Sequence, residues 1–437
     1  MGGLFKVRSF NKILKEILKA VLCATAWEVF MNSDAKKIID EALKEALPDS
    51  AVKKALKEIK FNDGKLVLIS IGKAAWQMAK AAYDALGKRI DEGAVITKYG
   101  HSKGAIGTLE IYEAGHPVSD ANTYSSTQRC IDLVTGLSNT DNVLFLISGG
   151  GSALFEKPLV SEQENQDITK QLLACGADIV EMNTLRKRLS SVKGGKFAQI
   201  CAPAHVFAIV LSDIIGDPLD MIASGPAYPD SSTTEQALSI VEKYSLKLSA
   251  EARKCIEIPT PKKLDNVTTY VTGSVKQLCL SASKTAESLG YEPIFLTASL
   301  NCEAREAGAF LAAIARDNEA SGKKLAFIAG GETVVHLTGK GKGGRNQEIA
   351  LAAADGIRKV KKCCIFSVGS DGTDGPTDAA GGCVDQETAA ILDKQGIVIS
   401  SVLKNNDAYN ALKAADALVF TGPTGTNVND LTVLLLN

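Results

Sequence analysis

The run Gly339-Lys340-Gly341-Lys342-Gly343-Gly344-Arg345-Asn346-Gln347-Glu348 shows how this chain is built. A strand-like apolar run (325–337) enters it, and a helix-like run (347–357) leaves it. Glycines let the backbone approach an anion, a helix start offers unpaired N–H groups, and Lys342 and Arg345 add full charges. The run therefore predicts an anion site. Arg345 is expected to be its more specific ligand, because a planar guanidinium group can donate hydrogen bonds to two oxygens at once. A dinucleotide loop of the G-x-G-x-x-G type and a plain turn are the alternatives.

The strand and glycine pattern of this run recurs along the whole chain. Apolar segments without alternation, each followed by a glycine corner and usually by a helix, predict parallel sheets that helices cover on both faces. In such sheets, ligands bind beyond the carboxyl ends of the strands. The segments are 65–70, 142–148, 206–211, 268–272, 326–329, 364–368 and 418–421.

Length and composition indicate a globular protein with more than one domain. The 437 residues exceed an ordinary single core. We expect two α/β domains with mostly parallel sheets, 33–260 and 261–437, because the least apolar connection (250–267) contains prolines and several lysines. A net charge of -1 and an aromatic content of 5% favour neither nucleic acid nor an anionic membrane as partner. A small-molecule partner is therefore expected.

Cysteine and histidine usage argues against structural metal sites and disulfides. The ten cysteines include no C-x-x-C pair, and the four histidines show no metal-ligand spacing. A reducing, cytoplasmic setting is therefore expected. The first 32 residues carry several lysines before a short apolar run (20–27), but Glu16 and Glu28 interrupt the pattern, which favours an accessory helix over a signal peptide.

The loop 371–382 carries three carboxylates, Asp371, Asp374 and Asp378, at the end of an apolar strand. Closely spaced carboxylates repel one another unless a cation lies among them, and hard oxygen ligands suit magnesium. The loop therefore predicts a magnesium site. The alternative is a set of Asx-turns in which each aspartate caps its own backbone.

Two further corners combine a strand end with a charged side chain. Lys73 follows Gly72 and opens a helix-like run, where the helix dipole disfavours a cation. Such a local conflict is typical of functional sites, so Lys73 is predicted to bind a carboxylate or phosphate, with a surface lysine as the alternative. Asp213 ends the apolar strand 206–211, where an unpaired carboxylate is costly, and is a candidate base or metal ligand.

Other corners offer uncharged donors and acceptors. Gly149-Gly150-Gly151-Ser152 presents backbone N–H groups to a ligand, or else forms a tight turn. The segments 405–407 and 424–430 add amide and hydroxyl groups suited to a polyol or nucleotide, although Asn and Asp also form ordinary turns and caps. The chain lacks the P-loop, protein-kinase and serine-hydrolase motifs.

Taken in order, a series of motifs resembles the two-domain glycerate 2-kinases, whose C-terminal part is the MOFRL domain. The resemblance covers about residues 34–437. One departure is Ala153, which stands where a second serine is familiar in that family. The motifs are I-G-K-A-A-W (71–76), L-I-S-G-G-G-S-A-L-F (146–155), L-S-D-I-I-G-D-P-L-D-M-I-A-S-G-P-A (211–227), G-G-E-T-V-V-H (330–336), G-G-R-N-Q-E (343–348), D-G-T-D-G-P-T-D-A-A-G-G (371–382), N-N-D-A-Y-N-A-L (405–412) and T-G-P-T-G-T-N-V-N-D (421–430).

The resemblance implies ATP-dependent phosphorylation of D-glycerate at its 2-hydroxyl, with magnesium, in a cleft between a Rossmann-like domain and a smaller MOFRL domain. The positions matching Lys73 and Arg345 are implied as principal active-site residues, each facing the same polyanion, and Asp213 completes the predicted catalytic set. The residues predicted to bind substrate or nucleotide are Gly149, Gly150, Gly151, Ser152, Gly330, Gly331, Glu332, Thr333, Gly343, Gly344, Asn406, Asp407 and Thr424.

Two other functions stay open at this stage. A nicotinamide-dependent hydroxypyruvate reductase would use Gly339, Gly341 and Gly344 as its dinucleotide loop, but Lys361 and Lys362 stand where a ribose-binding acid is expected. A catalytically silent sugar-acid-binding protein is the third alternative. The sequence leaves the oligomeric state open, with a homodimer among the alternatives.

Overall fold

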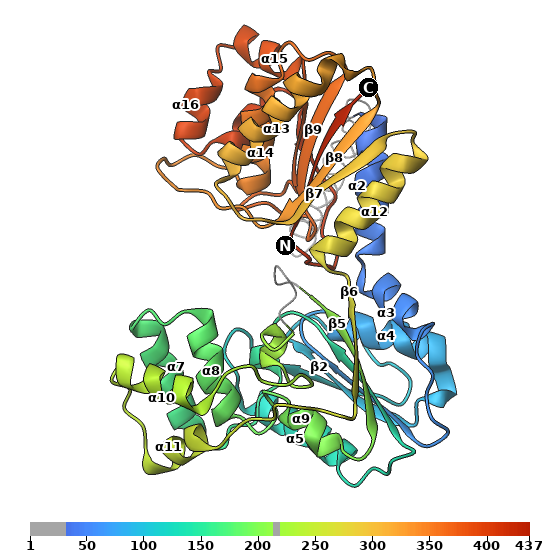
Figure 1. Ribbon diagram of the computed structural model, residues 1–437, viewed down its shortest axis with the longest axis vertical. Coiled ribbons are helices and arrows are strands. Elements are labelled where there is room, and N and C mark those ends of the chain that lie inside the picture. The colour runs from blue at the N-terminus through green and yellow to red at the C-terminus, as the bar shows by residue number, and fades with distance from the viewer. Residues whose placement is uncertain (1–31, 213–218) are drawn as a thin grey trace, which may run out of the picture. The chain divides into compact units, whose positions relative to one another are not determined.

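The structure, a computed structural model, describes residues 32–212 and 219–437, and it divides into two compact units (Figure 1). The first unit comprises residues 46–274, and the second comprises residues 275–437 together with helix α2 (Ser33–Glu45). The boundary predicted at residue 260 lies instead after strand β6, because the polar connection 259–265 only leads into the last strand of the first sheet. Predicted Asp213 lies outside the described residues.

The first unit contains a six-stranded sheet in which every pair is parallel, as predicted. The order is β3-β2-β1-β4-β5-β6, so the direction of strand addition reverses between β1 and β4. In open parallel sheets this switch point, at the carboxyl ends of the strands, is where ligands bind. The strands are β1 (Leu66–Ile71), β2 (Glu92–Lys98), β3 (Glu110–Ala114), β4 (Asn142–Ile147), β5 (His205–Leu211) and β6 (Val267–Thr272).

Helices of the first unit form two sets. One set covers the sheet: α3 (Pro48–Leu56), α4 (Ala75–Leu86), α5 (Ala121–Val134) and α9 (Lys196–Cys201), with the single turn α6 (Gly151–Leu154) at the end of β4. The other set, seen as a separate group in Figure 1, packs around its own apolar core. It consists of α7 (Glu162–Ala174), α8 (Ile179–Leu189), α10 (Thr234–Lys243) and α11 (Ala250–Glu257).

The second unit corrects the expectation of a mostly parallel sheet. Its order is β11-β10-β9-β12-β8-β7, and only the β7–β8 pair is parallel. Strand β12 lies antiparallel between β8 and β9, and all three are buried on both faces. A continuous apolar run therefore predicts that a strand is buried on both faces, but it does not predict whether the strand is parallel or antiparallel to its neighbours. The strands are β7 (Glu292–Leu300), β8 (Leu325–Gly331), β9 (Cys363–Gly369), β10 (Gly381–Asp385), β11 (Leu418–Val419) and β12 (Asp430–Leu436).

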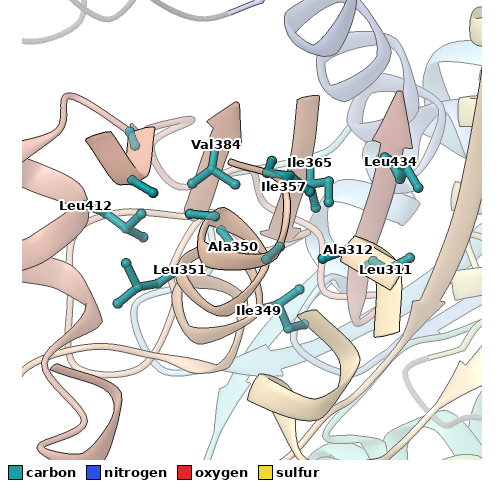
Figure 2. Packing of buried hydrophobic residues seen from close by; sticks show 14 of the residues in the cluster. Leu311, Ala312, Ile349, Ala350, Leu351, Ile357, Ile365, Val384, Leu412 and Leu434 are labelled. Carbon is teal, nitrogen blue, oxygen red and sulfur yellow. The ribbon is translucent and has the colours of Figure 1, made fainter. Parts of the chain in front are cut away.

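Helices cover both faces of this second sheet (Figure 1). Helix α2 packs beside α12 (Val275–Ser288) on one face, where the hydroxyl of Tyr291 donates to Asp34 Oδ2 at 2.9 Å. Helices α13 (Ala304–Asn318) and α14 (Arg345–Gly356) lie on the other face, with α15 (Thr388–Lys394), α16 (Ile399–Lys404) and α17 (Ala408–Ala414) beyond them. Figure 2 shows side chains of α14 on the side of the sheet that carries Ile365 and Val384, while Leu434 lies beside Leu311 and Ala312 of α13. No helix among the described residues is long and apolar enough to cross a membrane.

Candidate functional site

Lys73 lies at the switch point of the first sheet, against the triple-glycine corner. Its backbone N–H donates to the carbonyl of Gly149 at 2.9 Å, so the turns after β1 and β4 are joined. Gly72 has a φ of +109°, and a Cβ there would lie 2.3 Å from Ser148 Oγ, so only glycine allows this approach. The Lys73 side chain is exposed and forms no ion pair with a described carboxylate. Two predicted features, Lys73 and Gly149–Ser152, are thus brought together.

His116, which the sequence interpretation missed, borders the same corner. A Cβ on Gly150 would lie 3.1 Å from His116 Nε2 and 3.2 Å from Lys73 Cγ, so both side chains flank this glycine. Burial lowers the pKa of His116, and the charges of Lys73, Lys98 and His101 lower it further. The electrostatic environment of this corner is therefore positive, as an anionic ligand requires.

The opposite side of the triple-glycine corner meets the segment 222–224. Ser152 Oγ lies 3.0 Å from Ser224 Oγ, which donates to Asn183 Oδ1 of α8 at 3.0 Å. Ala223 and Ser224 have φ values of 51° and 60°, which non-glycine residues rarely adopt. Such strain persists only where the surroundings enforce it, and it gathers at functional sites.

A cluster of buried ion pairs holds α8 in place behind this corner. Lys187 Nζ lies 3.0 Å from Asp230 Oδ1 and 3.1 Å from Asp220 Oδ2, and Arg188 Nη1 lies 3.5 Å from Asp230 Oδ2. Lys193 Nζ lies 3.2 Å from Glu156 Oε2. These three cations and three carboxylates are paired and largely buried, and they fix the helix and the turns that contact it.

Arg345, the predicted phosphate clamp of the second unit, is already held by carboxylates. It begins α14, and its Nε and Nη2 donate to Asp430 Oδ2 and Oδ1 at 2.5 and 3.1 Å. Its Nη1 donates to Glu332 Oε1 at 3.1 Å. Burial opposes its charge, but the hydrogen bond and charge of Asp430 outweigh burial and raise the pKa of Arg345. The arginine therefore has a neutralising partner, whereas Lys73 has none among the described carboxylates.

The start of α14, which was predicted to face an anion from a ligand, carries a carboxylate of the protein itself. Asp374 accepts hydrogen bonds from the backbone N–H groups of Asn346 and Gln347, at 3.2 and 2.9 Å. A Cβ on Gly344 would lie 2.3 Å from Asp374 Cγ, so this glycine makes room for the aspartate. Burial raises the pKa of Asp374 to about 6, although the two N–H groups lower it. Asp374 thus caps the helix.

The glycines before Arg345 pack against the loop 405–407. Asn406 Oδ1 accepts from the N–H groups of Thr338 and Gly339, at 2.8 and 2.9 Å. Asp407 Oδ1 accepts from Lys342 N at 2.9 Å. Asn406 and Asp407, predicted as ligand-binding residues, therefore accept from the N–H groups of Gly339 and Lys342, which belong to the run predicted to cradle an anion.

The three aspartates predicted to bind magnesium do not converge. Asp378 Oδ1 accepts from the Tyr409 hydroxyl at 2.7 Å, and Asp371 Oδ1 accepts from Thr373 N at 2.9 Å, an Asx-turn. Within 32–212 and 219–437, no three His, Cys, Asp or Glu side chains are grouped so that they could hold a metal ion. The described residues do not form a joint magnesium site. Asp371 follows the Asx-turn alternative, whereas Asp374 and Asp378 accept hydrogen bonds from distant parts of the chain.

Comparison with known proteins identifies the family. The Domain of unknown function (DUF4147) model matches residues 34–257, and the MOFRL family model matches 325–430. A D-glycerate 2-kinase from Thermotoga maritima is 52% identical over 408 residues, covering 92% of this chain and 97% of that protein. The chain belongs to the glycerate 2-kinase family.

Two further comparisons describe the range of the glycerate 2-kinase family. The crystal structure of glycerate kinase from Thermotoga maritima superposes with a TM-score of 0.89 at 51% identity, covering 92% of this chain and 99% of that one. A putative hydroxypyruvate reductase from Agrobacterium vitis is 38% identical, covering 85% of this chain and 100% of that protein. The α/β fold and the family resemblance are therefore confirmed.

The remaining predicted positions lie near the end of β8 and in the loop before β12. Gly330 and Gly331 pack tightly against their neighbours. A Cβ on Gly330 would lie 2.5 Å from Cys279 Sγ, and a Cβ on Gly331 would lie 2.3 Å from the carbonyl oxygen of Leu300. Thr333 Oγ1 is buried and has no hydrogen-bond partner in the described chain, while Thr424 Oγ1 donates to the Ser370 carbonyl at 2.5 Å. The binding roles of these four positions stay predictions.

The sequence did contain a signal for the missed α8 side of the site. Between Glu181 and Asp213 there is no acidic residue, while the cations Arg186, Lys187, Arg188, Lys193 and Lys196 fall there. Such a charge imbalance beside a glycine pair (194–195) favours an anion nearby. His116 carried no comparable signal, because a single histidine after a strand is common.

Proposed function

We propose that this member of the glycerate 2-kinase family transfers the γ-phosphoryl group of ATP to the 2-hydroxyl of D-glycerate, giving 2-phosphoglycerate and ADP. The observation that carries the proposal is the positive corner at the switch point of the first sheet, where Lys73 and His116 flank Gly150. The 52% identical D-glycerate 2-kinase supports it. Phosphoryl transfer asks a protein mainly for positioning and for cancelling negative charge.

In this proposal Lys73 supplies the positive charge that binds the anionic ligand. It is exposed and has no carboxylate partner in the described chain, so binding an anion does not require breaking an ion pair. The turn Gly149–Ser152 brings backbone dipoles to the same point. The predicted proton acceptor is Asp213, whose role stays a prediction.

Arg345 binds a phosphate of the nucleotide through the edge of its guanidinium group that Glu332 occupies. The side chain of Asp430 is 5% exposed and that of Glu332 is 49% exposed, so the two carboxylates hold the arginine unequally. A phosphate displaces the exposed Glu332 more readily than the buried Asp430. Magnesium enters as part of the MgATP substrate, since this ion usually takes only one or two carboxylates and otherwise binds phosphates and water.

Product analysis by phosphorus NMR tests the proposed reaction. The protein is incubated with MgATP and D-glycerate, and the expected result is 2-phosphoglycerate with an equal amount of ADP. A signal from 3-phosphoglycerate, or no transfer, would contradict the proposal. A parallel incubation with hydroxypyruvate and NADH addresses the reductase alternative, for which we expect no oxidation of the nicotinamide.

A further inference from the structure

Arg186 lies on the face of α8 that contacts the segment 222–224, which borders the triple-glycine corner. Asn183, three residues earlier, is on the same helical face and accepts from Ser224 Oγ at 3.0 Å. Ser224 Oγ is in turn 3.0 Å from Ser152 Oγ of the corner. The chain of contacts places the Arg186 side of the helix toward the site that Lys73 borders from β1.

Arg186 differs from the two cations that follow it. Lys187 and Arg188 are buried and share Asp230 as a carboxylate partner. Arg186 is half-buried and forms no hydrogen bond or ion pair with any residue in 32–212 or 219–437. Of these three consecutive cations, Arg186 is the one without a partner in the part of the chain that the structure describes.

The described residues around Arg186 supply little negative charge to balance it. Burial lowers the pKa of Arg186, and among the residues that the structure describes, the charge of Glu156 acts in the opposite direction. Glu156 is itself committed to Lys193, whose Nζ lies 3.2 Å from its Oε2. A desolvated guanidinium without a carboxylate is costly unless an anion binds to it.

We propose that Arg186 binds the carboxylate of the 2-hydroxy acid substrate, and that Lys73 is thereby left to hold the transferring phosphoryl group. This inference rests on the proposed function. A guanidinium fork matches a carboxylate with two parallel hydrogen bonds, whereas an ammonium acts as a point charge. Arg186 is therefore a substrate-binding residue that the motifs around Lys73 and Arg345 do not include.

Steady-state kinetics of Arg186→Gln and Arg186→Lys test this inference. We expect Arg186→Gln to raise KM for D-glycerate about 10- to 100-fold, the loss typical of a charge-assisted hydrogen-bonded pair, with KM for ATP unchanged within about twofold. Arg186→Lys keeps the charge without the fork, so a smaller rise is expected. The control is Arg253→Gln, an exposed arginine of α11 paired with Glu257 at 3.5 Å, which should match wild type.

Three outcomes decide the question. A KM for D-glycerate within twofold of wild type in an active Arg186→Gln enzyme would overturn the role of Arg186 and leave the reaction intact. If Arg186→Gln does not fold, an unchanged KM in Arg186→Lys, together with failure of guanidinium ions to restore Arg186→Ala, would overturn it equally. A wild-type protein that neither phosphorylates nor binds D-glycerate, by calorimetry, would overturn the proposed function and this inference together.

Discussion

In each unit a cation follows a strand and a glycine corner. The two cations differ in whether carboxylates of the described chain pair with them. Lys73 in the first unit is exposed, without a carboxylate partner in the described chain, and has other positive side chains near it. Arg345 in the second unit is fixed by Asp430 and Glu332. The same local pattern can therefore supply a free cation for a ligand or a paired cation that also supports the fold.

Removing the unpaired cation should abolish activity without weakening the fold. For Lys73→Ala we expect kcat/KM for D-glycerate to fall about 1000-fold, the scale of a lost transition-state contact, and the melting temperature to stay within about 2 °C. Lys80→Ala is the matched control, because Lys80 on α4 forms only an exposed pair with Asp84. Near-wild-type turnover of Lys73→Ala would remove the distinction between the two cations.

Removing the partner of the paired cation should act mainly on stability. Asp430→Asn leaves the guanidinium of Arg345 partly buried beside a neutral side chain, which should cost about 3 kcal/mol of unfolding free energy. Urea unfolding measures this change. A stability equal to wild type would show that Arg345 does not depend on Asp430.

The cap of α14 should make stability depend on pH. The pKa of Asp374 is raised to about 6 from 3.8, so the folded protein binds this proton more tightly than the unfolded chain. Its contribution is present below about pH 4 and is lost as pH rises through about 6, a change of about 3 kcal/mol. Asp374→Asn should remove this slope in urea unfolding between pH 4 and 6. Asp378→Asn is the control, because the Tyr409 hydrogen bond lowers the pKa of Asp378 and its contribution has the opposite sign.

The exposed partner of Arg345 should have the smallest effect. Glu332→Gln removes an ion pair whose carboxylate side chain is 49% exposed, so the expected loss is below about 1 kcal/mol by urea unfolding. Together with Asp430→Asn, this variant measures how unequally the two carboxylates hold the arginine. Equal losses would contradict the proposed displacement of Glu332 by phosphate.

The first unit was predictable because its chemistry is local to strand ends. The segments 65–70 and 142–148 were placed within two residues of β1 and β4, and parallel strands bring their corners together. Lys73 and Gly149–Ser152 follow from that arrangement. His116 and Arg186 were missed because their proximity depends on how β3 and α8 pack, which no spacing reports.

The structure of the second unit was less predictable, because contacts between residues far apart in the sequence determine how its loops and helix ends are arranged. The apolar run at 431–436 gives burial on both faces of β12 but carries no information about direction. Asp374 caps α14 from a loop 28 residues along the chain, and Asn406 reaches Thr338 across 68 residues. A glycine-rich turn predicts room for an acceptor, but it does not say whether a ligand or the protein supplies it.

Calorimetric titration of D-glycerate, in the presence of ADP, tests most directly the claim that the first unit carries the anion site. The account predicts measurable binding to wild type and to Glu332→Gln, and binding at least about 30-fold weaker to Arg186→Gln. Undiminished binding of D-glycerate to Arg186→Gln would contradict the account.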